Sequence, residues 1–508
     1  MATGVVCGLL IALSVPPFGF WPLAWVGFAG IALALPGRPA RDRFALGFGA
    51  GLGQYVVGLA WVSEFSIPGC AALMILGALF VASTLLIVPV RRPGTLGLAM
   101  PAAFILSDWV RARFPLGGFP LGGTSLGQAA SPLVPSTRLG GSLLLTGETV
   151  LVGVTIAQAI RVALGWRAGT HRPNRLGKSR SAAGAAPRAL ALFAAAAVAV
   201  PIAGRLSPAG FGGHLSPLKI ALVQGGGPRG TRAIHTDPQV VFDRHLTAAQ
   251  GIYGPVDLVV MPEGILQTDQ AFTNSADAAE IAGLAQNLAS TVVVGVEQDV
   301  GTKHYLNEVA AWSSSGAVTA TYVKNHLVPF GEYVPFRSVI ARLFNVSDVP
   351  LDAIAGHGAG YMKTPAAPLG VMVSYEVFFD ERARGGVRSG GQILIVPTNT
   401  ASYRSSQVPT QELAAARLRA WETGRWVLQV TPTGYSAIVT PSGRILNRSI
   451  LGMQTVIEGT ANRESGTTVY VAVGDGPFAI VSALLLLFAL VIARWDSRLP
   501  RQTGPPER

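Results

Sequence analysis

The chain has 508 residues, of which 50% are hydrophobic and only 13% are charged. With a mean hydropathy of +0.43, this composition excludes an ordinary soluble globular protein of this length and predicts membrane spans. The formal net charge of +12 does not indicate nucleic-acid binding, because the basic residues crowd the short segments between apolar stretches.

Eight apolar stretches are long enough, or nearly long enough, to cross a bilayer: 5–13, 22–35, 46–61, 71–90, 96–110, 143–164, 189–202 and 478–492. The first two are short and flank a break at Pro16, Pro17 and Gly19, so they form either two spans or one bent hairpin. A cleavable signal peptide is the alternative for the first stretch, although its start lacks Lys or Arg and more spans follow. We therefore predict a polytopic α-helical membrane domain of about eight spans, with helices in 1–205 and a last one in 476–494.

The basic residues follow the pattern that sets the orientation of membrane proteins. With the amino terminus inside, eight spans place nearly every basic cluster on the cytoplasmic side: Arg38, Arg41 and Arg43; Arg91 and Arg92; Arg161, Arg167, Arg172, Arg175, Lys178, Arg180 and Arg188; and Arg494, Arg498 and Arg501. The exceptions are Arg111 and Arg113, after Asp108 and Trp109, where charge at the membrane edge is more often functional or paired than idle. This arrangement puts a polar basic loop, 169–187, and a tail, 495–508, in the cytoplasm. It puts everything from about residue 204 to 476 outside the plasma membrane.

The segment 217–474 differs from its flanks and reads as one α/β domain. Short β-branched runs end in turn-forming residues: KIALVQG, DLVVMPE, TVVVGVEQ, GVMVSYEVF, QILIVPTN, WVLQVTPTG and TVYVAVG. Between several of them, helical patterns occupy 238–250, 276–288 and 410–423. Strands that alternate with helices predict a domain with buried sheets.

Three candidate catalytic residues lie at strand ends or in the loops that follow. Glu263 closes DLVVMPE, Lys324 lies in TYVKNHLVPFGEYVPF, and Ser374 closes GVMVS. Functional side chains of α/β proteins gather at such positions. A carboxylate, an ammonium and a hydroxyl are the base, the oxyanion-stabilising charge and the nucleophile that acyl transfer requires, although each residue alone is more often a surface charge or a turn former.

The segments MPEG, YVKNHLVPFGEYVPF, SYEVFF and RLRAWETGRWVLQVTPTGYSA resemble the apolipoprotein N-acyltransferase family, whose soluble domain belongs to the carbon-nitrogen hydrolase, or nitrilase, superfamily. The resemblance extends over nearly the whole chain, including FPLGGTSLGQ and the last span, and KNHLVPFGEYVPF is its most specific part. It implies a four-layer α-β-β-α sandwich outside the membrane. It also implies acyl transfer from a phospholipid to the amino group of diacylglyceryl-cysteine in lipoproteins, through an acyl-enzyme.

By the same resemblance, Glu263 matches the general base, Lys324 the oxyanion-stabilising lysine and Ser374 the position of the nucleophile. Glu332 and Glu376 match carboxylates that hold or complete the site, and the backbone amide of Tyr375 is a further candidate to face the oxyanion. No metal and no cofactor are expected, and the expected partners are phospholipid donors and lipoprotein acceptors.

The chain departs from the family pattern at the nucleophile, because Ser374-Tyr375-Glu376 stands where the family has Cys-Tyr-Glu. The only cysteines, Cys7 and Cys70, lie in apolar stretches, so no thiol of the α/β domain can replace it. A serine hydroxyl ionises far less readily than a thiol and demands a better base. Met261 and the stretch Thr398 to Tyr403 also differ from the family, which bears on the substrate entrance.

Two alternatives stay open from the sequence: a silent or slow paralogue that binds lipoproteins or assists an active enzyme, and a membrane-tethered amidase. His304 and His326 have no second ligand at metal spacing and are more often structural in loops. Gly225 to Gly227 lack the Lys-Ser/Thr ending of a phosphate loop, so nucleotide binding is not expected.

Overall fold

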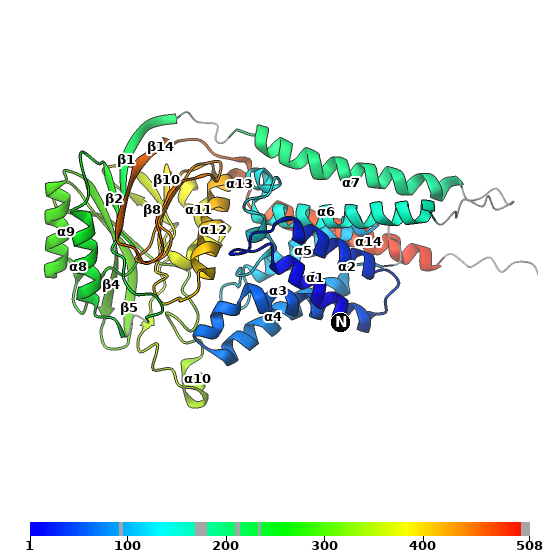
Figure 1. Ribbon diagram of the computed structural model, residues 1–508, viewed down its shortest axis with the longest axis horizontal. Helices are drawn as coiled ribbons and strands as arrows, with labels where there is room; N and C mark the ends of the chain where they lie inside the picture. Colours follow the sequence, from blue (N-terminus) through cyan, green and yellow to red (C-terminus); the bar gives the residue numbers. More distant parts are fainter. Residues whose placement is uncertain (91–94, 168–179, 209–213, 232–234, 499–508) are drawn as a thin grey trace, which may run out of the picture.

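The computed structural model describes residues 1–90, 95–167, 180–208, 214–231 and 235–498. These residues form a helical bundle and an α/β domain packed end to end (Figure 1). The bundle contains α1 (Ala2–Ala12), α2 (Pro22–Ala34), α3 (Ala40–Gly58), η1 (Ala60–Glu64), α4 (Ile67–Ile87), α5 (Leu96–Arg111), α6 (Thr137–Arg167), α7 (Arg180–Leu206) and α14 (Gly476–Arg498).

Small residues allow the helices of the bundle to approach closely. A Cβ added at Gly8 of α1 would lie 1.9 Å from the carbonyl oxygen of Ala50 in α3, and one at Gly51 would lie 2.4 Å from Cα of Ala78 in α4. Such contacts between small residues are typical of helix packing in membranes. The α1–α3–α4 packing therefore depends on glycine.

Four helical segments within the described residues are long and apolar enough to cross a membrane: Ile67–Ile87, Val134–Leu164, Pro187–Leu206 and Gly476–Arg494. The apolar helices Ala2–Ala12 and Pro22–Ala34 are shorter. Each of the eight apolar stretches coincides with a helix, but the number of spans stays a prediction. Arg91, Arg92, Arg172, Arg175, Lys178, Arg501, part of the 169–187 loop and most of the 495–508 tail lie outside the described residues, and α7 already begins at Arg180.

The α/β domain contains two sheets. The first has the order β14 (Thr455–Glu464), β1 (His214–Gln224), β2 (Leu258–Val260), β4 (Thr291–Val300), β5 (His304–Trp312) and β6 (Val318–Val323), with β3 (Leu266–Thr268) beside β4 and β7 (Asp352–Ala353) beside β5. The second has the order β13 (Ile445–Arg448), β12 (Ala437–Val439), β11 (Val427–Val430), β10 (Ile393–Pro397), β9 (Pro368–Val371) and β8 (Tyr361–Lys363). The central strands β1, β2 and β4 are parallel to one another, as are β9, β10 and β11.

Helices cover both outer faces, which confirms the predicted four-layer sandwich (Figure 1). One apolar core joins the two sheets, for example Ile220 and Val293 of the first with Val371 and Ile395 of the second. A second core lies between the first sheet and the helices α8 (Pro238–Ala249) and α9 (Ala276–Asn287). The other outer layer consists of α11 (Asp380–Arg388) and α12 (Gln407–Thr423), which also face the bundle. A small helix, α10 (Arg337–Leu343), projects from the side of the domain (Figure 1).

One predicted strand is wrong. TVYVAVG forms the short helix α13 (Val469–Val473), capped by the Thr468 side chain, which accepts a hydrogen bond from the amide of Val471. Tyr470 at its centre is fully buried and lies against Gly141 of α6, where an added Cβ would be 2.5 Å from the ring. Packing against the bundle therefore overrides the β propensity of the valines.

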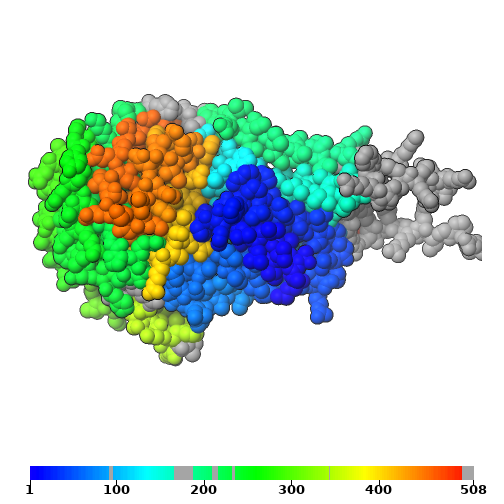
Figure 2. Space-filling view, in the orientation of Figure 1, coloured from blue at the N-terminus to red at the C-terminus, as the bar shows by residue number. Residues whose placement is uncertain are grey.

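The two parts of the molecule share a continuous interface, and Figure 2 shows the blue bundle surface against the yellow start of α12. Gln407 and Gln411 of α12 donate side-chain hydrogen bonds to the carbonyl oxygens of Val57 (2.7 Å) and Gly58 (3.1 Å) in α3. Glu64 of η1 accepts a hydrogen bond from the amide of Arg404 at 2.8 Å. The loop between β10 and α12 is thereby fastened to the bundle.

Candidate active site

A buried cluster of charges lies at the ends of β2 and β6. The ammonium of Lys324 donates to Oε1 of Glu263 at 2.9 Å and to Oε1 of Glu332 at 2.8 Å. The side-chain amide of Asn307 donates to the same two oxygens at 2.8 and 2.6 Å. Lys324 is only 1% exposed and Glu263 only 5%. Buried charges of this kind are held only by paired and hydrogen-bonded neighbours, and this cluster supplies them.

Strand geometry brings the members of the cluster together. Glu263 follows β2, and an added Cβ at Gly295 of β4 would lie 2.5 Å from Cα of Glu263, so the turn passes directly over a glycine. The amide of Lys324 donates to the carbonyl oxygen of Asn307 at 2.8 Å, which extends the β5–β6 ladder to the site. The ends of β2 and β6 and the interior of β5 therefore place Glu263, Lys324 and Asn307 next to one another.

Ser374 follows β9 in the second sheet, as the first residue of the short helix η7 (Ser374–Phe378). Its φ is +50°, a left-handed conformation that costs a non-glycine residue about 1 to 3 kcal/mol. The side chain is partly exposed, and its hydroxyl makes no hydrogen bond with any residue the structure describes. A strained and accessible residue at a strand end is typical of a functional position.

Glu376 joins the Ser374 turn to the loop that contains Lys324. Its fully buried carboxylate accepts hydrogen bonds from the amides of Asn325 (2.8 Å), His326 (3.1 Å) and Val373 (2.8 Å), and from the Tyr322 hydroxyl (2.8 Å). Asn325 and His326 directly follow Lys324. The two sheets therefore hold the turn and the ion pair in a fixed relation.

Electrostatics set the protonation of the cluster. Burial alone would lower the pKa of Lys324, but Glu263 and Glu332 more than offset it, so the pKa is raised and the ammonium stays charged. Burial raises the pKa of Glu332, against the opposing effect of Lys324. The Tyr375 hydroxyl donates to the carbonyl oxygen of Gly118 in the bundle, and burial raises its pKa too.

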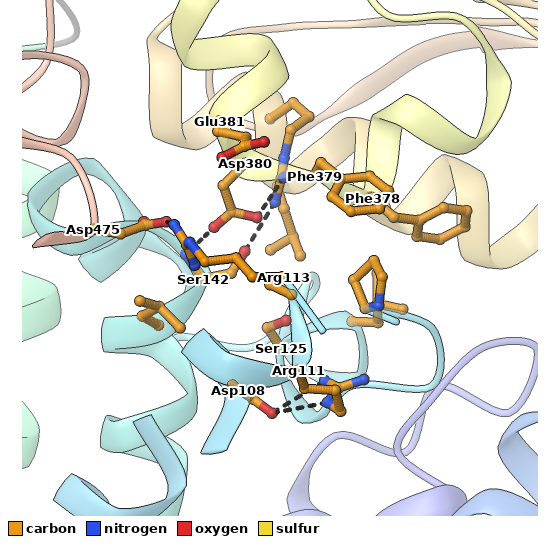
Figure 3. Close-up of a pocket in the computed structure, with 17 residues that line it drawn as sticks. Asp108, Arg111, Arg113, Ser125, Ser142, Phe378, Phe379, Asp380, Glu381 and Asp475 are labelled. Atoms are coloured by element: carbon orange, nitrogen blue, oxygen red, sulfur yellow. Dashed lines mark hydrogen bonds and ion pairs between the residues drawn. The ribbon is translucent and has the colours of Figure 1, made fainter. Parts of the chain in front are cut away.

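Beside the Ser374 turn, a cavity of about 50 Å³ lies between the bundle and the α/β domain (Figure 3). Arg111 and Arg113, the two exceptions to the basic pattern, line it, and both are paired: Arg111 with Asp108 at 3.0 Å and Arg113 with Asp475 at 2.9 Å. On the opposite wall, Phe378 ends η7, Phe379 follows it and Asp380 begins α11.

The structure therefore brings together Glu263, Lys324 and Glu332 directly, and the Ser374–Tyr375–Glu376 turn through Glu376. Sequence reasoning missed Asn307, which looks like an ordinary strand residue in HYLNEVAAW, and Tyr322 and Arg382, which both contact Glu376. His326 lies 3.3 Å from Glu381 and His304 3.3 Å from the carbonyl oxygen of Asp352, so both contact groups outside the cluster.

Comparisons with known proteins find two matching family models and several similar proteins. Residues 219–469 match the carbon-nitrogen hydrolase family, and residues 7–155 match the apolipoprotein N-acyltransferase N-terminal domain. An apolipoprotein N-acyltransferase from Azotobacter vinelandii is 30% identical, over 97% of this chain and 95% of its own. One from Mycolicibacterium smegmatis is 29% identical, over 87% of this chain and 76% of its own. An amidase structure from Nesterenkonia sp. aligns with 54% of this chain and 99% of its own, at 19% identity and a TM-score of 0.36.

Proposed function

The chain belongs to the apolipoprotein N-acyltransferase family, and from that premise we propose that it is a membrane transferase that moves an acyl chain from a phospholipid to a lipoprotein. The acceptor is the α-amino group of an amino-terminal diacylglyceryl-cysteine. The single observation that carries the proposal is the buried Glu263–Lys324 ion pair, held by Glu376 beside the strained Ser374 turn.

In the first step, Glu263 takes the proton of the Ser374 hydroxyl while Ser374 Oγ attacks the ester carbon of the phospholipid. The ammonium of Lys324 and the backbone amide of Tyr375 stabilise the oxyanion. The carbon–oxygen bond to the lysophospholipid then breaks, and the proton on Glu263 passes to the leaving oxygen. An acyl ester on Ser374 remains.

In the second step, the uncharged amine of the lipoprotein attacks the acyl ester. The bond between the carbonyl carbon and Ser374 Oγ breaks, and the amine proton passes through Glu263 to the Ser374 oxygen. The products are an amide and the free hydroxyl, so the enzyme returns to its starting state.

A plasma-membrane location suits substrates that carry acyl chains, since each buried methylene contributes about 0.8 kcal/mol to membrane retention. The end of α6 and the end of α14, which carry Arg161 and Arg494, lie at the end of the bundle away from the α/β domain (Figure 1). Basic residues at that end favour a multi-pass arrangement with the α/β domain on the extracytoplasmic side.

The Ser374 hydroxyl has no hydrogen-bond partner among the described residues, which favours one second candidate, a silent or slow paralogue that binds lipidated proteins without acylating them. The test is to reconstitute the full chain in phospholipid vesicles with a diacylglyceryl-cysteine peptide, and to measure N-acyl peptide by mass spectrometry. We expect product from the wild type and from Ser389→Ala, an exposed serine after α11, and none from Ser374→Ala. Peptide binding without product in the wild type would favour the second candidate.

A further inference from the structure

Two carboxyls that the mechanism does not use lie around the Glu263–Lys324 pair. Glu297 of β4 pairs in register with Asn307 of β5, the residue that donates to both Glu263 and Glu332. A Cβ added at Gly264, next to Glu263, would lie 2.8 Å from Oε1 of Glu297. The carboxyl of Glu297 is therefore packed against the turn that carries the proposed base.

Glu412 reaches the site from α12, in the layer between the second sheet and the bundle. It is 3% exposed, and the Thr398 hydroxyl donates to its Oε1 at 2.8 Å. Its Oε2 is buried and has no hydrogen-bond partner among the described residues. A carboxylate with an unpartnered buried oxygen costs far more free energy than a neutral carboxyl in the same place, so this environment favours the protonated form.

The balance of charges explains why protons are needed here. Four carboxyls, Glu263, Glu297, Glu332 and Glu412, share the field of the Lys324 ammonium. If all four were ionised, the net charge around Lys324 would be strongly negative, and an oxyanion developing at Ser374 would be repelled rather than stabilised.

We propose that Glu297 and Glu412 are positioning residues that each hold a proton at neutral pH, so that the charge of Lys324 stays available to the oxyanion. The inference rests on the proposed function. Neither residue touches the substrate; both act through the electrostatic field at Glu263 and Lys324.

Their titration fits this role. Burial, followed by repulsion from Glu263 and Glu332, raises the pKa of Glu297 to about 8. Burial also raises the pKa of Glu412 to about 8. The other groups that face Glu297 are Lys324, Asp299 and Tyr305, and those that face Glu412 are Glu263, Lys324, Tyr403 and Thr398.

The test is the acylation half-reaction of the full chain in vesicles of phosphatidylethanolamine and phosphatidylglycerol, with no acceptor, so that no acceptor amine titrates. For each variant, the acylation rate above pH 8 is divided by its own rate at neutral pH. As both carboxyls ionise, we expect the wild-type acylation rate above pH 8 to be on the order of tenfold lower than its rate at neutral pH. In the double variant, Glu297→Gln combined with Glu412→Gln, this rate ratio should stay close to one. Each single variant should give an intermediate ratio.

The matched control is Glu308→Gln. Glu308 is the next residue of β5 after Asn307, so strand alternation places it on the opposite face, and burial raises its pKa to about 7. This variant should keep the wild-type ratio. An alkaline loss in the double variant equal to that of the wild type would overturn the inference.

A second measurement does not depend on activity. The infrared band of protonated carboxyls at neutral pH should lose intensity in Glu297→Gln and in Glu412→Gln. An unchanged band in both variants contradicts the inference. If the wild type forms no acyl adduct at any pH, the proposed function fails, and the infrared band still decides whether the two carboxyls hold protons.

Discussion

The hydroxyl of Tyr322 donates to the carboxylate of Glu376 at 2.8 Å, which joins β6 of the first sheet to the Ser374 turn of the second. Arg382 adds to this connection, because its guanidinium donates a hydrogen bond to the Tyr322 oxygen at 2.9 Å. Because the bond has a charged acceptor and is fully buried, Tyr322→Phe should destabilise the fold by about 1.5 to 3 kcal/mol. It should also slow acylation, because the turn loses one anchor.

The measurement is the thermal unfolding midpoint of the full chain in detergent, with the acylation rate of the same preparation. Tyr361→Phe, on the edge strand β8, is the control and should change neither. If Tyr322→Phe unfolds at the wild-type temperature, the hydrogen bond between Tyr322 and Glu376 does not stabilise the fold, which contradicts the prediction.

The left-handed backbone of Ser374 predicts a conflict between stability and activity. Ser374→Gly and Ser374→Ala both remove the hydroxyl and should both abolish acylation. Glycine adopts a φ of +50° without strain, whereas alanine does not, so the glycine variant should be more stable than the alanine variant by about 1 kcal/mol. Comparison of the two unfolding midpoints tests this, and a more stable alanine variant would show that the conformation is not strained.

The interface between the bundle and the α/β domain depends on Arg419 of α12. It is 1% exposed and pairs with Asp380 at 2.6 Å and with Glu422 at 2.9 Å, and it donates to the Ser142 hydroxyl of α6 at 2.8 Å. Arg419→Met leaves Asp380 and Glu422 without this ion-pair partner and should cost about 3 to 5 kcal/mol.

Arg417 on the same helix is the matched control, because its side chain donates a hydrogen bond to the carbonyl oxygen of Gly443 within the α/β domain. Limited proteolysis should cut the Arg419→Met variant between the two domains faster than Arg417→Met. Equal rates for the two variants would mean that the ion pairs do not hold the domains together.

The elevated carboxyl pKa values predict a loss of stability as pH rises from the unfolded pKa to the folded pKa of these groups. The folded-state pKa of Glu297 and Glu412 is about 8, above the unfolded value of about 4.3. Their contribution is therefore complete below the unfolded value and is lost as pH rises through about 8. The unfolding midpoint should fall over this range in the wild type and fall less in Glu297→Gln and Glu412→Gln. A wild-type midpoint that is constant across it would contradict the raised values.

The fold could be predicted from the sequence wherever the local residue pattern alone determines whether a segment forms a helix or a strand. Long apolar stretches have no alternative to burial in a helix, and β-branched runs that end in turns mark buried strands, so Glu263 and Ser374 could be placed at strand ends. Asn307 and Glu297 could not be recognised, because strand pairing across β4 and β5, not local sequence, brings them to the site. Val469–Val473 forms a helix because its surroundings are the bundle and not a sheet.

Acylation of Ser374 tests the central claim most directly. The purified full chain is incubated with phospholipid vesicles, digested, and the peptide that contains Ser374 is examined by mass spectrometry; a diacylglyceryl-cysteine peptide is then added. We predict an acyl adduct on Ser374 in the wild type, absent in Ser374→Ala and Glu263→Ala, that disappears as the added peptide gains the same acyl chain. Product that forms without any adduct on Ser374, or an adduct that the peptide never removes, would contradict the account.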